Sequence, residues 1–212
     1  MTAGCSGDDD PAPEPTGLLS VTTMRGALLQ ATEIGPTWAA PEQTPDPGKL
    51  VSICGGTSTP PTAPPGAEVV AGSYVDEGQK GAQTLDQTAL VYPDATAATA
   101  GQTALRAVAE TCPASVTVPA TATADKSEPA YTETVQIQPL EQSAWTGFAV
   151  IRHKKYELAH PGTADVAVAV LRSRNVVLVD SYAIYQLNNA STGPNFDADW
   201  QKLVGSVLQR VG

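Results

Sequence analysis

Hydrophobic and polar residues alternate in the second half of the chain, a pattern typical of β-strands that bury one face. In the segment 131–138, Val135 and Ile137 alternate with threonine and glutamine residues. Runs rich in β-branched and aromatic residues predict four strands here, at 131–138, 145–153, 164–172 and 176–185. The tight turn Ser173-Arg174-Asn175 joins the last two strands. The alternation favours an antiparallel sheet that is covered on one side.

The first half of the chain predicts a β-hairpin that follows a long loop. The segments 67–75 and 84–92 are rich in strand-forming residues and flank the turn-prone residues 76–81. The preceding segment 39–66 is rich in Pro, Thr and Gly. We interpret it as an ordered loop of the kind that covers a sheet edge or frames a cleft.

Three segments have the spacing of amphipathic helices. Residues 18–34 predict one helix or two short ones, ended by Gly35-Pro36, and Asp94 is a favourable N-cap for an Ala-rich helix at 95–111. The segment 196–211 has one apolar stripe, formed by Trp200, Leu203, Val204, Val207, Leu208 and Val211. Together these elements predict an α+β fold with a central antiparallel sheet of about six strands and helices packed on one face.

The three cysteines divide into one near the N-terminus and two inside the domain. If Cys5 is set aside, Cys54 and Cys112 form an even pair, which oxidises in an exported protein. We therefore expect one disulfide. The alternative is a free catalytic thiol, which needs a histidine partner, and the chain has only His153 and His160.

The N-terminal residues suggest a lipid anchor. The sequence Thr2-Ala3-Gly4-Cys5 resembles the end of a bacterial lipobox, in which small residues precede a cysteine that is acylated on sulfur. The next residues, SGDDDPAPEPT, offer charge and proline and no apolar cluster to bury. We expect residues 1–16 to be a lipobox remnant and disordered tether, and residues 17–212 to form the domain, anchored outside the cell membrane through lipid on Cys5. An accidental cysteine is the alternative.

The charge of the chain excludes some partners. A net charge of −10 repels nucleic acid backbones and anionic lipid headgroups, so we expect no nucleic acid partner. The sequence contains no run of about 20 apolar residues, so we expect membrane attachment by the lipid alone.

Asp180 is the most unusual candidate for chemistry. The chain lacks the motifs of nucleotide, zinc and hydrolase sites, so we predict no cofactor, no metal and no catalytic residue. Asp180 shares a strand face with Leu178 and Tyr182, so it either pairs with an arginine or faces a cleft. Polar and aromatic residues of the C-terminal strands are the candidates for a ligand cleft: Thr134, Gln136, Trp145, Arg152, Asp180, Tyr182 and Tyr185.

Several dispersed segments carry a resemblance to a known family. They are Ala27-Leu28-Leu29, Glu33-Ile34-Gly35 with Trp38, Cys54, Val91-Tyr92-Pro93-Asp94 before the helix ending at Cys112, Asn175-Val176-Val177-Leu178-Val179, and the helix with Trp200, Leu203 and Val204. Over residues 18–211 the chain resembles the extracellular sensor domain of PknH-like mycobacterial Ser/Thr kinases, which actinobacterial lipoproteins share. The resemblance implies a single α+β domain with a cleft for an unidentified ligand. It also implies a disulfide between Cys54 and Cys112, whereas the kinase domain's second disulfide has no cysteines here.

We therefore expect a cell-surface lipoprotein that binds or senses an unidentified small-molecule or cell-wall ligand without catalysis. Any signal would pass through a protein partner. The first alternative is a structural or protein-interaction lipoprotein of the envelope, which an exposed apolar patch without a pocket would favour. A remote alternative is an envelope hydrolase, which a nucleophile and base within hydrogen-bond reach would favour.

Overall fold

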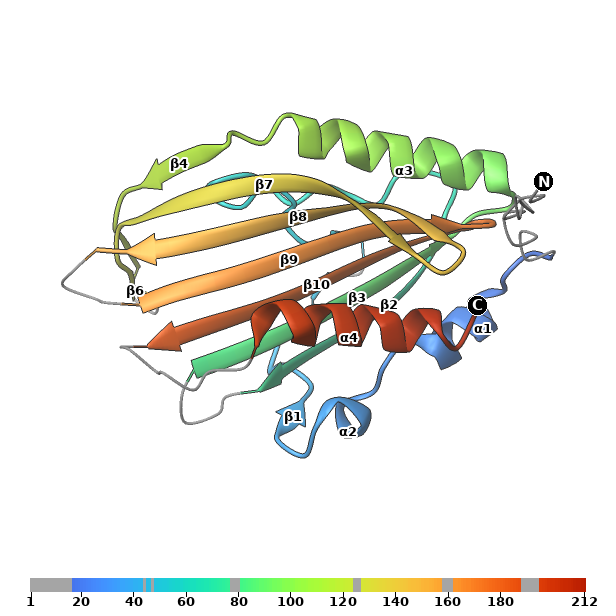
Figure 1. The fold of residues 1–212 in the computed structure, drawn as a ribbon, viewed down its shortest axis with the longest axis horizontal. Coiled ribbons are helices and arrows are strands. Elements are labelled where there is room, and N and C mark those ends of the chain that lie inside the picture. Colours follow the sequence, from blue (N-terminus) through green and yellow to red (C-terminus); the bar gives the residue numbers. More distant parts are fainter. Residues whose placement is uncertain are drawn as a thin grey trace, which may run out of the picture.

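A large antiparallel sheet forms the centre of the molecule (Figure 1). The computed structural model describes residues 17–43, 45–46, 48–76, 81–123, 127–157, 162–187 and 195–212. Within these ranges eight strands lie in the order β1 (Trp38–Ala39), β2 (Glu68–Asp76), β3 (Gly81–Val91), β10 (Val176–Leu187), β9 (Gly162–Ser173), β8 (Trp145–Tyr156), β7 (Tyr131–Gln142) and β4 (Ser115–Val118). A separate small hairpin pairs β5 (Thr121–Ala122) with β6 (Ser127–Glu128).

All six predicted strands are present, and the sheet is larger than expected because two short edge strands join it. The edge strand β1 is only two residues long and lies at the start of the Pro-rich loop, so it has no strand pattern of its own. The other edge strand, β4, pairs Ser115 to Val118 with the beginning of β7. Neither adds more than a few ladder bonds, which is why the hydrophobic pattern alone does not reveal them.

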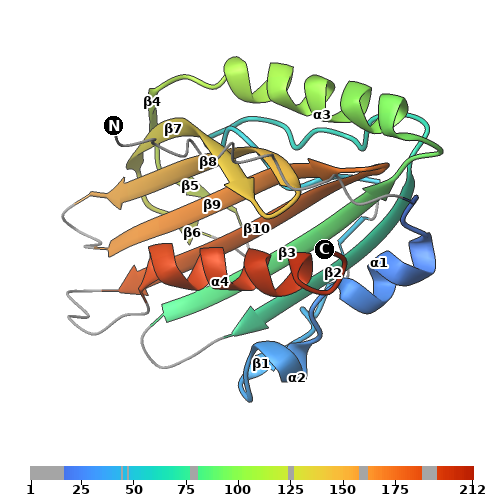
Figure 2. The same ribbon diagram turned by 45° about the vertical axis from the view of Figure 1, so that its right-hand side comes forward.

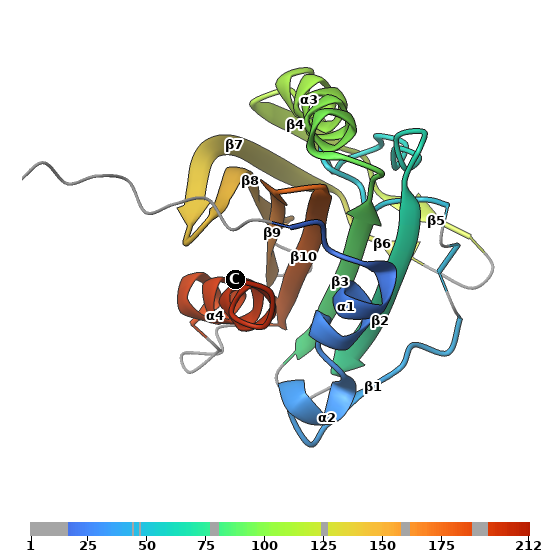
Figure 3. The ribbon, with the colours of Figure 1, turned by 90° about the vertical axis from the view of Figure 1, so that its right-hand side faces the viewer.

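The helices cover both faces of the sheet, which corrects the expectation that they pack on one. The helices α1 (Val21–Ala27), α2 (Ala31–Ile34) and α4 (Phe196–Leu208) lie on one side, and α3 (Ala95–Glu110) lies on the other (Figure 3). Figure 2 shows α4 and α1 in front of the strands, α2 below them beside β1, and α3 along the top, beyond the strands. No helix in the described ranges is long and apolar enough to span a membrane.

The central strands explain this arrangement because they are apolar on both faces. In β9, Val168 and Val170 pack with α3, whereas Ala169 and Leu171 pack with α1 and α4. A strand buried on both faces reads as a continuous apolar run. The alternation in the outer strand β7 describes the sheet margin and not its centre.

A disulfide closes the α3 face, as predicted. Cys54 and Cys112 are bonded, with their Cα atoms 4.9 Å apart, and so join the long loop to the end of α3. This pairing also excludes both thiols as free nucleophiles. Next to the disulfide, the loop crosses a buried ion pair between Glu133 and Arg152, whose Oε1 and Nη1 atoms are 3.4 Å apart. The Gly56 N–H donates to Glu133 Oε2 at 2.6 Å.

Asn175 fastens the N-terminal segment to the far end of the sheet. The Leu19 N–H donates to its side-chain oxygen at 2.7 Å, and its amide nitrogen donates to the carbonyls of Leu19 and Tyr92 at 3.0 and 2.8 Å. Asn175 is almost completely buried, so these bonds satisfy an amide that burial would otherwise penalise. The segment that leads into α1 is therefore fixed before the helix begins.

The C-terminal helix is a core element, and its apolar stripe is not uniform. Trp200, Val204, Val207 and Leu208 are buried, whereas Leu203 is only half-buried. We expect Leu208→Ala to lower the free energy of unfolding by about 2–5 kcal/mol, because it leaves a cavity in the core. Leu203→Ala should cost less, about 1–2 kcal/mol, and Gln209→Ala, which changes an exposed residue, almost nothing. Equal urea midpoints for all three variants would show that α4 does not bury this stripe.

Gly55 is the position where the loop on the α3 face is least tolerant. Its φ is +69°, and a Cβ there would collide with the side chains of Arg152 and Glu133. We expect Gly55→Ala to destabilise the domain by the left-handed backbone penalty of about 1–2 kcal/mol and by displacement of the ion pair in addition. Gly26→Ala in α1 is the control, since a Cβ at Gly26 meets nothing within 4 Å and alanine favours helix. Denaturant midpoints that fall equally for the two variants would contradict this explanation.

Candidate functional site

A groove lies on the face of the sheet that α1, α2 and α4 cover. It encloses a cavity of about 190 Å³ between the N-terminal segment and α4. Apolar side chains of the N-terminal segment form one wall, namely Leu29, Ile34 and Trp38. Residues of α4 form the other wall, among them Asp199, Lys202, Leu203 and Ser206, and the sheet forms the floor. We call this cavity the α2–α4 groove.

The N-terminal wall exists because the helix breaks between α1 and α2. Leu28 is the C-cap of α1 in extended conformation, and the Leu29 N–H then donates to Gln87 Oε1 on β3 at 3.0 Å. Glu33 restarts the helix by accepting from the Gln30 N–H at 2.8 Å. The sheet therefore uses Gln87 to hold the chain at the point where the two short helices meet.

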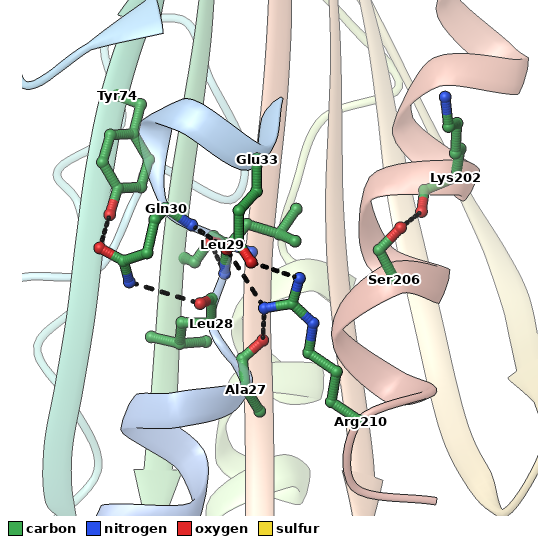
Figure 4. Close-up of polar contacts among 10 residues, drawn as sticks. Ala27, Leu28, Leu29, Gln30, Glu33, Tyr74, Lys202, Ser206 and Arg210 are labelled. Carbon is green, nitrogen blue, oxygen red and sulfur yellow. Dashed lines mark hydrogen bonds and ion pairs between the residues drawn. The ribbon is translucent and has the colours of Figure 1, made fainter. Parts of the chain in front are cut away.

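Arg210 ties the two walls together at one end of the groove (Figure 4). Its Nη2 lies 3.0 Å from Glu33 Oε1, and its Nη1 donates to the Ala27 carbonyl at 3.3 Å. The hydrogen bond from Arg210 and the one from the Gln30 N–H lower the pKa of Glu33. Both partners of this ion pair are partly exposed, so it contributes to the position of α2 more than to stability.

Tyr182 and Gln83 form the floor of the groove. Tyr182 lies on β10 and donates its hydroxyl proton to Gln83 Oε1 on β3 at 2.7 Å. Its ring stacks on Phe196 of α4, with centroids 6.0 Å apart. Burial raises the pKa of Tyr182, and the negative charges of Asp199 and Asp76 raise it further. Tyr182 is therefore a neutral hydrogen-bonding group at any physiological pH.

Asp180 is buried beside this floor, and its partner is an amide. Gln87 Nε2 donates to Asp180 Oδ2 at 3.1 Å, whereas Oδ1 has no hydrogen-bond partner among the described residues. No ion pair within those residues involves it. Burial, with a smaller contribution from Asp86, raises the pKa of Asp180 to about 7. Gln87 thus connects a carboxyl that titrates near neutrality to the Leu29 amide in the groove wall.

The structure divides the candidate cleft residues between the two faces of the sheet. Of the seven, only Tyr182 lines the α2–α4 groove. Asp180 and Trp145 are on the same face and buried in the core, and Thr134 and Gln136 are exposed there on β7, beyond α4.

The other two candidates lie on the α3 face, because they have the opposite strand parity. Arg152 is in the ion pair with Glu133, and Tyr185 packs on the ring of Tyr156 with centroids 5.4 Å apart. These two side chains therefore do not share a cleft with Tyr182. Cys5 and His160 lie outside the described residues.

Sequence reasoning did not identify most of the groove residues. Trp38 occurs in a loop without periodicity, and Lys202 and Ser206 are polar positions beside the apolar stripe of α4. Gln83 is a polar residue near the start of a strand, with nothing to mark it as part of a site. The one sequence feature that could have indicated these residues is Leu203, whose apolar side chain belongs to the stripe of α4 and also lines the groove.

The geometry offers little support for hydrolysis. His153 Nδ1 contacts Asp165 Oδ1 on the neighbouring strand, so a histidine–carboxylate pair exists. In the part of the chain that the structure describes, no hydroxyl or thiol forms a hydrogen bond with His153. The pair lies on exposed sheet away from the groove, and it is not an assembled nucleophile and base.

Comparison with known proteins supports the fold. The structure is similar to the crystal structure of the extracellular domain of PknH from Mycobacterium tuberculosis, with a TM-score of 0.51 and 15% sequence identity. The match covers 91% of this chain and 98% of that domain. No protein-family model matches the sequence, and no curated protein matches it. The chain therefore has a PknH-like fold, as the dispersed sequence segments implied.

Asp180→Asn tests the buried carboxyl. An unfolded carboxyl titrates near pH 4 and the buried one near 7. Between these values the folded protein binds one more proton, so the free energy of unfolding should fall as pH rises from about 4 to about 7 and stay level above. In the variant the free energy of unfolding should not show this decline. It should equal that of wild type near pH 4 and exceed it at pH 8 by a few kcal/mol, since each pH unit between the two pKa values contributes roughly 1.4 kcal/mol. Urea melts across this range would contradict the assignment if both proteins had the same slope.

Proposed function

We propose that this domain binds a small molecule in the α2–α4 groove and acts outside the cytoplasm as a surface-anchored binding or sensing protein. The observation that carries the proposal is the groove itself. Two aromatic side chains, Trp38 and Tyr182, meet polar groups from three different elements in a cavity of about 190 Å³. Small-molecule sites typically combine an apolar lining with a few convergent polar groups.

The size of the cavity limits the ligand. Sites for drug-sized molecules occupy roughly 300–1,000 Å³, so a cavity of about 190 Å³ suits a ligand of one ring or a short chain. A small metabolite or a small fragment of the cell wall would fit. A larger polymer would place only one of its units in the groove.

Two observations support a location outside the cytoplasm. The fold is that of an extracellular domain in another protein, and the Cys54–Cys112 disulfide is typical of oxidising compartments. The N-terminal residues 1–16 lie outside the described residues, and their sequence supports our proposal that Cys5 is acylated and tethers the domain at 17–212. A protein partner would then read whether the groove is occupied.

Ligand binding is better supported than a purely structural role. Leu18 is the one large hydrophobic side chain that is strongly exposed in the described ranges. A docking protein would present a contiguous apolar patch without a pocket, whereas here the apolar groups line a cavity. We propose no catalytic step.

A pocket-filling variant tests the proposed function. In Ser206→Trp the indole would occupy the groove, because Ser206 is on the wall of α4 that faces it. Gln201→Trp is the matched control, since Gln201 is exposed on the same helix and does not line the groove. Two-dimensional NMR with a mixed library of cationic, anionic and neutral fragments should show shifts around Tyr182 in wild type and the control, but not in Ser206→Trp. If no fragment distinguishes the two tryptophan variants, the groove is not a binding site.

A further inference from the structure

We propose that the α2–α4 groove selects small organic cations of the alkylammonium class, because two aromatic side chains and the Asp199 carboxylate line it and the Asp76 carboxylate lies beside its floor. This inference rests on the function proposed above and names its ligand class. It follows from the charged and aromatic side chains around the cavity. Hydrogen bonds within the described part of the protein satisfy only some of their polar atoms.

The charges at the groove do not cancel. Glu33 is neutralised by Arg210, whose guanidinium lies 3.0 Å away. Asp76 and Asp199 take part in none of the ion pairs found among the described residues. The positive charge of Lys202, which lines the cavity together with Asp199, offsets the negative charge of one of these two carboxylates. One negative charge therefore remains in excess beside the groove, because Asp76 does not line the cavity but is the register partner of Trp38 and Gln83, which do. A monovalent cation in the groove would compensate it.

Asp76 is the stronger indication of an unsatisfied negative charge. It ends β2, opposite Gln83 in the register, and only 8% of its surface is exposed. Its Oδ1 atom is buried without a hydrogen-bond partner in the described part of the chain. A buried carboxylate oxygen without a partner costs free energy, which a bound ammonium group nearby would reduce.

Both carboxylates act on the same ring. After the larger effect of burial, Asp199 and Asp76 each raise the pKa of Tyr182, which shows that their charges reach its hydroxyl. That hydroxyl donates to Gln83, so Tyr182 has no second proton to give to an anionic ligand. Tyr182 and Trp38 both line the cavity, and aromatic rings attract cations, tryptophan most strongly.

Lys202 is the group that an anionic ligand would use, and it is poorly placed for that role. Its side chain is exposed and extends away from Ser206 and Arg210 (Figure 4). Arg210 is already committed to Glu33 and the Ala27 carbonyl. The net charge of −10 on the whole chain also favours the approach of cations.

Benzylammonium tests the ligand class, with benzyl alcohol and benzoate as probes of the same size but different charge. NMR titration of the wild-type domain should rank benzylammonium above benzyl alcohol and benzoate. Asp199→Asn should weaken benzylammonium by about three- to tenfold, since it removes one opposite charge close to the ligand. Asp197→Asn is the matched control, because Asp197 is in the same first helical turn and does not line the groove.

Lys202→Gln makes the test directional. It removes a like charge, so it should strengthen benzylammonium binding, by a smaller factor than the loss in Asp199→Asn because the Lys202 side chain is exposed, whereas a site for anions would lose affinity in this variant. The inference is overturned if benzoate or benzyl alcohol binds as tightly as benzylammonium, or if Lys202→Gln weakens benzylammonium. If fragments of another class bind the wild-type domain and Ser206→Trp abolishes that binding, the groove is a binding site and only the assignment to cations is wrong. If Ser206→Trp changes the binding of no probe, the proposal that the groove is a binding site is wrong as well.

Discussion

The central strands β8, β9 and β10 are apolar on both faces, and most of the architecture follows from covering them twice. On one face, α3 and the disulfide-linked loop form the cover. On the other, the cover comes from the two ends of the chain, with α1 and α2 from one end and α4 from the other. These two pieces do not form a continuous surface, and we call the line along which they meet the seam. The α2–α4 groove is that seam, so its position is a consequence of how the sheet is buried.

The strand and helix pattern is readable from the sequence where the elements are long and periodic. Segments such as 95–111 and 176–185 match the observed elements within a few residues, and the pairing of Cys54 with Cys112 is as expected. The two-sided cover differs from the expectation, because the clean alternation of Val135 and Ile137 in the outer strand does not extend to the whole sheet. The continuous apolar character of β9 contained the correct information. Strands buried on both faces lack the period that distinguishes inside from outside.

The site is less predictable than the fold. Strand parity gives the face on which a side chain lies, but it does not give the position of the seam on that face. Parity correctly places Asp180 and Tyr182 on one face, and the same rule separates Arg152 and Tyr185 from them. What parity does not give is the lateral position of α4 over the sheet, which decides that Tyr182 is open to the groove and Trp145 is sealed in the core. That position depends on packing between elements far apart in sequence. Trp38 in particular enters the groove through pairing of a two-residue strand, which leaves no trace in periodicity.

Four polar residues of β3 and β10, Asp180 among them, share a common location. Gln83 and Gln87 of β3 and Asp180 and Tyr182 of β10 all point to the face with the seam, at neighbouring positions in the β3–β10 register. A core built only for stability would fill such positions with apolar side chains, since a buried carboxyl with an unpaired oxygen lowers stability. The Gln87 amide joins this carboxyl to the Leu29 N–H, and therefore to the wall of the groove. This unfavourable burial thus lies under the seam between the two pieces of the cover, which is where a binding site needs polar groups held in fixed positions.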